Sequence, residues 1–149
     1  MGCDIHPFVE IQMADGTWVD MKAPDKLQDR TYGRFAFLTG GTVRNYSDLP
    51  EILPRPRGYP KDGSEYCKLE AKHNEEDWDH SASYLTLAEL LAVNYEQPIF
   101  DRRGVDAPTE PTTLRKFLGE NWFDILKELQ DMVAPDAAHR IRIVFDFDS

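Results

Sequence analysis

Two residues near the start of the chain, Asp4 and His6, have the types and the spacing to share a metal ion. In residues 3–13 apolar and polar side chains alternate, which is typical of a half-buried strand. Side chains two positions apart leave the same face of a strand. Because a carboxylate oxygen and an imidazole nitrogen are both ligands of zinc, manganese or iron, the pair predicts half of a metal site.

Two ligands do not hold such an ion, so others must come from elsewhere in the chain. The candidates are His73, Asp79, His80, Asp146 and Asp148. Our predicted set for zinc or manganese consists of four residues: Asp4, His6, His80 and Asp146. The alternative is that Asp4 and His6 are a polar pair on the solvent face of a hairpin.

His80 and His6 are the residues that we predict to act in catalysis. His80 lies in the polar segment 79–86, which precedes a predicted helix, and free amides at a helix start attract anions. Asp79, Ser81 and Ser83 could orient its imidazole. The alternative is an exposed His80 among turn residues.

We predict that a small anion is bound by three residues of the long segment 42–79, namely Arg44, Asn45 and Arg57. Planar guanidinium groups bind carboxylates and phosphates with two parallel hydrogen bonds. Equally, these arginines could pair with the acids at 75–79 and brace the segment.

We expect Cys3 to be a buried small side chain, because it lies on the apolar face of the first strand.

The elements that must position these groups can be predicted from periodicity. The strand at 3–13 returns at 17–21 through the turn Ala14-Asp15-Gly16. A helix is expected over 29–39, closed by Gly40-Gly41. The prolines of residues 42–79 predict a long irregular segment, either a lid or a brace.

The second half of the chain predicts helices and a final strand. Thr86 and Glu89 form a capping box that opens a helix to about Asn94. After a loop over 96–111, a helix is expected from residue 111 or 112 to 132, with a weak point at Gly119. The alternation in 140–149 is the clearest strand of the sequence.

This order predicts an α+β fold, in which about three helices cover a small, mostly antiparallel sheet, as one domain over residues 1–149. If the first and last strands pair antiparallel, Asp4 and His6 come near Asp146 and Asp148. Parallel or non-adjacent strands would separate them.

Composition narrows the class of function. Seventeen Lys and Arg against 27 Asp and Glu give a net charge of −10, which disfavours binding to a nucleic-acid backbone. Two cysteines are too few for a disulfide framework. The opening residues lack the features of a signal peptide, and no segment approaches the ~20 apolar residues of a membrane span. We therefore expect a cytoplasmic protein.

Several short blocks resemble a group of small uncharacterised proteins of bacteriophages and prophage-carrying bacteria. The blocks are the opening Met-Gly-Cys-Asp-Ile-His, Phe35 to Gly40 followed by Arg44-Asn45, the turn Pro56-Arg57-Gly58, and the stretch from His80 to Thr86. Where those proteins often carry His-Ser-His-Ser, this chain has Ala82 in place of the second histidine. The resemblance implies a phage-type accessory protein in the host cytoplasm.

Together these features suggest a small hydrolase that uses a divalent metal to cleave a phosphoester or a nucleotide. The alternative is a binding protein without catalysis. Such a protein would either sequester a small anionic or nucleotide ligand, or cover a basic surface of a host protein with its own acidic surface.

Overall fold

The centre of the molecule is a four-stranded antiparallel sheet, seen in a computed structural model that describes residues 2–74, 79–103 and 110–149. Its strand order is β2-β1-β6-β3. The strands are β1 (Asp4–Gln12), β2 (Trp18–Met21), β3 (His80–Thr86) and β6 (Ile141–Asp148). The α+β class and the antiparallel hairpin at 3–21 are as the sequence predicted.

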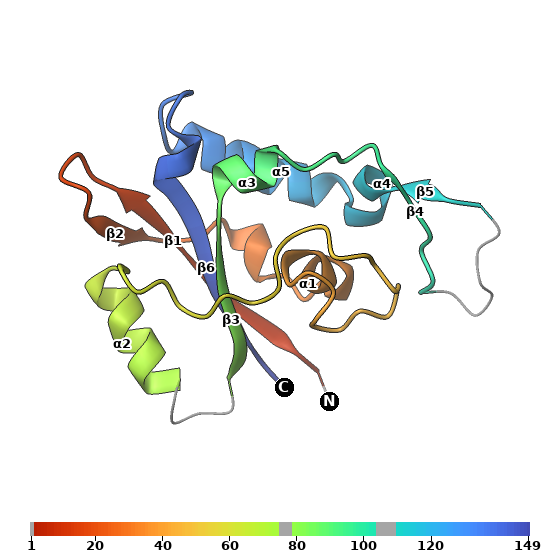
Figure 1. Cartoon of the computed structure of the whole chain (residues 1–149), viewed down its shortest axis with the longest axis horizontal. Helices are drawn as coiled ribbons and strands as arrows, with labels where there is room; N and C mark the ends of the chain where they lie inside the picture. The colour runs from red at the N-terminus through yellow and green to blue at the C-terminus, as the bar shows by residue number, and fades with distance from the viewer. Residues whose placement is uncertain (1, 75–78, 104–109) are drawn as a thin grey trace.

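The first and last strands are antiparallel neighbours, with Asp4 opposite Asp148 and His6 opposite Asp146. This pairing confirms the antiparallel alternative, which brings Asp4, His6, Asp146 and Asp148 to one end of the sheet. The two ends of the chain lie beside each other there (Figure 1). All but the last residue of β6 are buried, since a central strand is covered on both faces.

One face of the sheet packs against most of the helices. These are α1 (Tyr32–Leu38), α3 (Leu87–Leu91), α4 (Leu114–Leu118) and α5 (Glu120–Asp131). Their apolar residues and those of β1 and β6, such as Trp122, Phe35 and Phe145, form the main core. Short 3-10 turns at Asp25–Gln28 and Ala138–Arg140 complete this layer.

The opposite face of the sheet is covered by α2 (Glu65–Asn74), which stands on the other side of the sheet from α1 (Figure 1). The prediction of an irregular segment over all of 42–79 was wrong here. No proline follows Pro60 in this segment, so a helix can form there. At the start of α2 the Ser64 hydroxyl accepts a hydrogen bond from the Cys67 amide. Cys67 is the buried residue of α2, so the helix has too narrow an apolar stripe to predict from periodicity.

The polar segment 79–86, predicted only to precede a helix, contains the strand β3. It pairs with β6, with an irregularity between His80 and Ser83. The predicted capping box of Thr86 and Glu89 is present at the start of α3, which ends at Leu91 rather than Asn94.

Two further differences lie in the region between α3 and β6. Pro98–Ile99 (β4), in the predicted loop, pairs in a two-stranded sheet with Thr112–Thr113 (β5), where a helix was expected to begin. Part of that loop lies outside the described residues. The predicted weak point at Gly119 separates α4 from α5, because this glycine takes a φ of 81° that ends the first helix.

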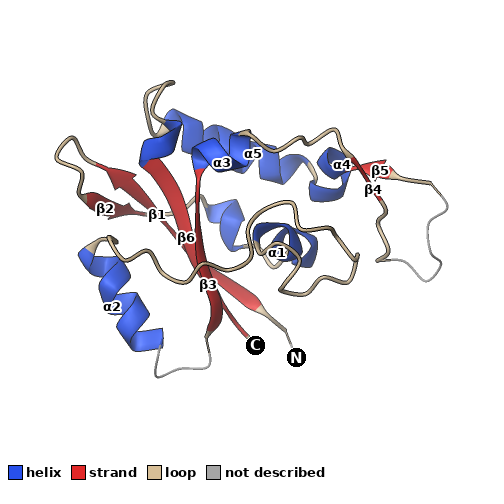
Figure 2. Ribbon diagram, in the orientation of Figure 1, coloured by secondary structure: helices blue, strands red, loops and turns tan. Residues whose placement is uncertain are grey.

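Residues 53–59, the strap, cross β3 between α1 and α2 (Figure 2). The Gly58 amide donates to the Ala82 carbonyl at 2.8 Å, and the Arg57 amide donates to the Ser83 hydroxyl at 3.1 Å. Leu53 is buried in the main core. This part of the 42–79 segment is therefore a brace that covers an open sheet edge.

No helix among the described residues is both long enough and apolar enough to cross a lipid bilayer.

Candidate metal centre

The even-numbered side chains of β1 and β6, most of them polar, form cross-strand pairs on the face covered by α2. We call four cross-strand pairs the polar-face ladder: Asp4 with Asp148, His6 with Asp146, Phe8 with Val144, and Glu10 with Arg142. They share a face because side chains alternate along both strands and the register places even-numbered residues opposite one another.

The inner half of the ladder attaches α2 to the sheet. Glu10 and Arg142 are almost fully buried, and the Arg142 guanidinium donates to the Glu10 carboxylate at 2.8 Å. The second Glu10 oxygen accepts the Ser64 amide at 2.7 Å, just before α2 begins. Phe8, Val144 and Cys67 pack in a second, smaller core beside this ion pair.

The outer half of the ladder carries the candidate metal group, which consists of His6, Asp79 and Asp146. One potential ligand atom from each lies within 4.8 Å of the other two. Asp79 precedes β3, and the pairing of β3 with β6 brings it beside Asp146. Ligand atoms at 2.0–2.2 Å from one tetrahedral ion lie about 3–4 Å apart, so a small inward movement of these side chains completes a site.

Asp146 gives the strongest indication of a ligand. Its side chain is only 3% exposed. Its Oδ2 atom accepts hydrogen bonds from the Tyr59 hydroxyl and the Asn74 amide, whereas Oδ1 has no partner among the described residues. Burial, assisted by the charge of Asp79, raises the pKa of Asp146 above its usual range. A buried carboxylate oxygen without a partner is costly, and a cation supplies what it lacks.

His6 is held by a carboxylate on the same face. Its Nε2 atom lies 2.6 Å from Asp148 Oδ2. Burial opposes the charged imidazole, but the hydrogen bond to Asp148 and the charge of Asp146 outweigh it, so the pKa of His6 is raised. Carboxylates commonly orient metal-binding histidines in this way.

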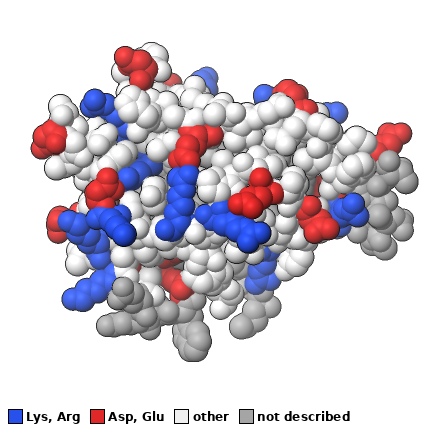
Figure 3. Space-filling view, viewed as in Figure 1, with Lys and Arg blue, Asp and Glu red and all other residues white. Residues whose placement is uncertain are grey.

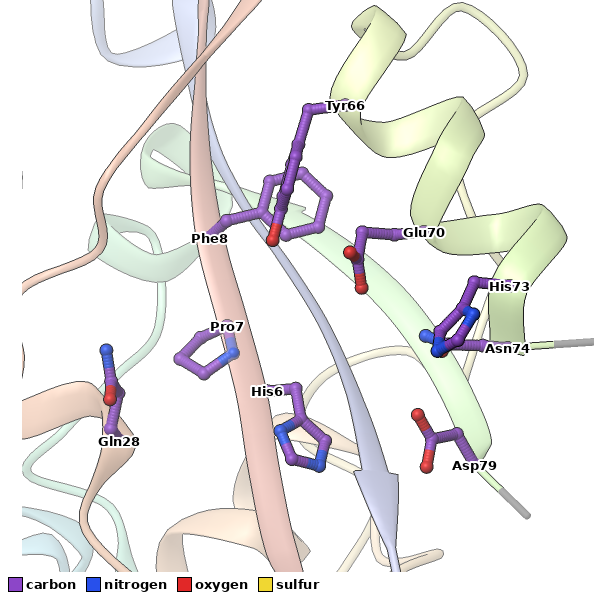
Figure 4. A pocket seen from close by; sticks show the side chains of 9 residues that line it. All are labelled: His6, Pro7, Phe8, Gln28, Tyr66, Glu70, His73, Asn74 and Asp79. Atoms are coloured by element: carbon purple, nitrogen blue, oxygen red, sulfur yellow. The ribbon is translucent and has the colours of Figure 1, made fainter. Parts of the chain in front are cut away.

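A cleft of about 430 Å³ between β1 and α2 opens beside the metal group. His6 and Asp79 point toward each other across its lower end (Figure 4). Tyr66, Glu70 and His73 line it from α2. A second hollow of about 360 Å³ adjoins Asp79 and Asp146, and His80 is part of its lining.

The structure brings together His6 and Asp146 of the predicted metal set, but it leaves Asp4 and His80 outside the group. Asp4 accepts a hydrogen bond from Arg30 at 2.8 Å, which lowers the pKa of Asp4. Arg30 therefore neutralises a carboxylate that the sequence assigned to a metal.

His80, predicted as a ligand and as a catalytic residue, stacks on Phe147 with ring centroids 6.3 Å apart. Its Nδ1 lies 2.9 Å from the Ser81 hydroxyl, and its Nε2 lies 2.7 Å from the Ser149 hydroxyl. The backbone is irregular here, with Ser81 at a φ of 58°. His80 pairs with Phe147 rather than Asp146, which directs its ring away from His6.

None of the residues predicted to bind an anion, Arg44, Asn45 and Arg57, lines the cleft. The Arg44 guanidinium donates to the Tyr46 hydroxyl at 2.8 Å. Asn45 bonds the backbone of Leu49 through both side-chain atoms. The Arg57 guanidinium pairs with both oxygens of Glu89, which is not one of the acids at 75–79 that the bracing alternative named. The predicted pairing with residues 75–78 lies outside the described residues.

Tyr59 and Asn74 were not predicted as site residues. Both depend on parts of the fold that the sequence pattern concealed, since Tyr59 ends the strap and Asn74 ends α2. Asp79 was one of the possible additional ligands, and β3 is what places it. Cys3 is buried, as expected, and Cys3 and Cys67 are both free thiols.

Comparisons of the chain with protein-family models, with curated proteins and with solved structures found no match.

Proposed function

We propose that the protein binds one divalent transition-metal ion at His6, Asp79 and Asp146 and uses it to hydrolyse a small molecule in the adjoining cleft. The observation that carries the proposal is the buried Oδ1 atom of Asp146, which has no hydrogen-bond partner in the described part of the chain and belongs to a group with a second carboxylate and an imidazole.

The donor atoms suit zinc or manganese, because both accept mixed nitrogen and oxygen ligands. Three protein ligands leave a position open for water, and a bound metal lowers the pKa of that water and polarises the substrate. In the reaction, the water oxygen bonds to the electrophilic phosphorus or carbonyl carbon. The bond to the leaving group breaks, and the leaving group takes up a proton.

The residues around the group have supporting tasks. Tyr59 and Asn74 hold one oxygen of Asp146, so that the other is available to the ion. Asp148 orients the ring of His6. His73 lies on the exposed wall of the cleft, where its imidazole can exchange a proton between substrate and solvent.

The test is calorimetric titration of zinc and of manganese into the wild-type protein and four variants. We expect one equivalent to bind, and His6→Ala and Asp79→Asn to weaken binding about tenfold or more. The matched controls His139→Ala and Asp136→Asn change exposed residues outside the group and should bind like the wild type. Absence of binding to the wild type, or equal loss in the controls, contradicts the proposal.

Turnover is tested by adding a chelator and then restoring the metal while phosphoesters, nucleotides, esters and amides are screened as substrates. Hydrolysis that follows the metal supports the enzyme. Unchanged recovery of a bound ligand would instead favour the non-catalytic alternative. From the sequence resemblance we also propose a phage-type accessory role in a host cytoplasm. Lys and Arg side chains are interspersed with Asp and Glu on the face shown in Figure 3, which gives the acidic-surface inhibitor no specific support there.

A further inference from the structure

The charge of the cleft limits which substrates the proposed enzyme can bind. Among the described residues that line it there is no Lys or Arg, whereas Glu70 and Asp79 are acidic. A divalent ion in the group is already balanced by two carboxylates, those of Asp79 and Asp146. The arginines expected to hold a phosphate are paired elsewhere. A strongly anionic substrate would therefore meet a neutral metal centre beside an additional negative charge.

The wall formed by α2 combines a carboxylate with an aromatic ring. Tyr66, Glu70 and His73 occur at helical spacing and therefore share one face of α2, which turns toward β1 (Figure 4). Phe8 packs edge-on against Tyr66, with ring centroids 5.0 Å apart and an angle of 88°. Glu70 points into the space between this pair and the metal group (Figure 4).

An aromatic face beside a carboxylate is an arrangement that attracts an ammonium group. The carboxylate contributes a charge-assisted hydrogen bond, and the ring contributes a contact with the cation. At the other end of the same cleft, His6 and Asp79 would present the metal to an oxygen of the ligand.

From this arrangement we infer that the cleft takes a small amine-bearing molecule, with its ammonium group between Glu70 and Tyr66 and a carbonyl or carboxylate oxygen at the metal group. The inference rests on the proposed function and narrows its substrate to amines that carry a nearby carbonyl. A volume of about 430 Å³ limits the bound part to a small molecule or the end of a chain.

The experiment compares three probes by calorimetry on the zinc-loaded protein: L-phenylalaninamide, 3-phenylpropanamide and phenyl phosphate. The first two differ only in the amino group. We expect phenylalaninamide to bind about fivefold or more tightly than 3-phenylpropanamide, and phenyl phosphate to bind more weakly than phenylalaninamide. Equal binding of the two amides, or preference for phenyl phosphate, overturns the inference.

Matched variants of α2 locate the effect. Glu70→Gln should remove the preference for the amine while zinc binding is unchanged, and Tyr66→Leu should weaken phenylalaninamide binding about threefold or more. Glu65→Gln and Leu69→Ala change exposed side chains of the same helix outside the cleft lining and should have no effect. Loss in both Glu variants, or in neither, contradicts the assignment. Failure of the wild type to bind zinc would contradict the proposed function itself, which is a separate outcome.

Discussion

The two faces of the sheet are built by different means. Toward α1 and α5, residues such as Ile5, Ile143 and Phe145 are buried among other apolar side chains, and no member requires one particular partner. Toward α2, the inner pair of the polar-face ladder, Glu10 and Arg142, is buried with its charges in place, so each of the two requires a specific partner. The first face supplies stability through buried apolar area. The second supplies a constrained arrangement of polar groups.

The polar face also differs along its own length. At the inner end, Glu10 and Arg142 satisfy each other and the start of α2. At the outer end, Asp146 is as deeply buried, but within residues 2–74, 79–103 and 110–149 only one of its oxygens has a hydrogen-bond partner. The same strands thus carry a structural ion pair and, four residues further along β6, an incomplete site. Incomplete satisfaction of a buried polar group is typical of functional positions.

The largest effect should come from truncating the apolar face. Phe37 is buried and packs edge-on against Trp122, with ring centroids 5.6 Å apart. Phe37→Ala should lower the free energy of unfolding by about 3–5 kcal/mol, measured by urea denaturation, because it leaves a cavity that the core fills only in part. Leu91→Ala, at an exposed position, is the control and should cost less than about 1 kcal/mol. Similar losses in both variants would refute the assignment of this core.

On the polar face, Arg142→Met should lower the free energy of unfolding by about 3 kcal/mol, because the change leaves the buried Glu10 carboxylate without its counter-charge. The double variant Glu10→Gln/Arg142→Met should recover at least half of this loss, since it removes the uncompensated charge and keeps an acceptor for the Ser64 amide. Thermal unfolding of the single and double variants measures the difference. An additive loss in the double variant would show that apolar packing, rather than charge pairing, dominates here.

The sequence predicted the apolar face better than the polar one for a physical reason. Alternation of apolar residues in 3–13 and 140–149 reports burial against a core, and it located β1 and β6 and their neighbouring ends. The same alternation makes the polar residues look solvent-exposed. Nothing in the pattern shows that α2 covers them, because this helix buries little more than Cys67.

The site was predictable to the extent that it depends on the β1–β6 register. Because Asp4 and His6 share a strand face with Asp146 and Asp148, the sequence could indicate a cluster there. It could not show that Arg30 neutralises Asp4, nor that the irregular start of β3 presents Asp79 to the cluster and turns His80 away. These outcomes depend on contacts between distant segments, which residue types and local spacing do not encode.

A stabilising change of about 1 kcal/mol is expected from Asp146→Asn in the metal-free protein, because an amide has a much lower desolvation cost than a buried carboxylate next to Asp79. The same variant should lose the increase in melting temperature that zinc gives the wild type. Differential scanning calorimetry with and without zinc measures both effects. If Asp146→Asn is destabilising without metal, the carboxylate has a structural role like that of Glu10, and the contrast between the two ends of the ladder fails.

The smallest effect should lie at the strap, which borders both faces. Its Arg57 pairs with Glu89, and the hydrogen bond from this guanidinium holds the pKa of Glu89 below its usual range. A lowered carboxyl pKa means that this contribution to stability is complete above the unfolded pKa, about 4.3, and is lost as the pH falls through the lower folded value. Because both side chains are about a third exposed, it should stay below about 1 kcal/mol.

Glu89→Gln isolates this charge, since a glutamine retains the capping box with Thr86. The variant should be less stable than the wild type near pH 7, and the difference should shrink as the pH falls through the carboxyl range, which urea denaturation across pH can follow. Glu96→Gln, which breaks the more exposed pair with Arg115, should change little at any pH. A difference that persists undiminished in acid would mean that Glu89→Gln acts through something other than the charge of Glu89, and that the ion pair with Arg57 does not hold the strap.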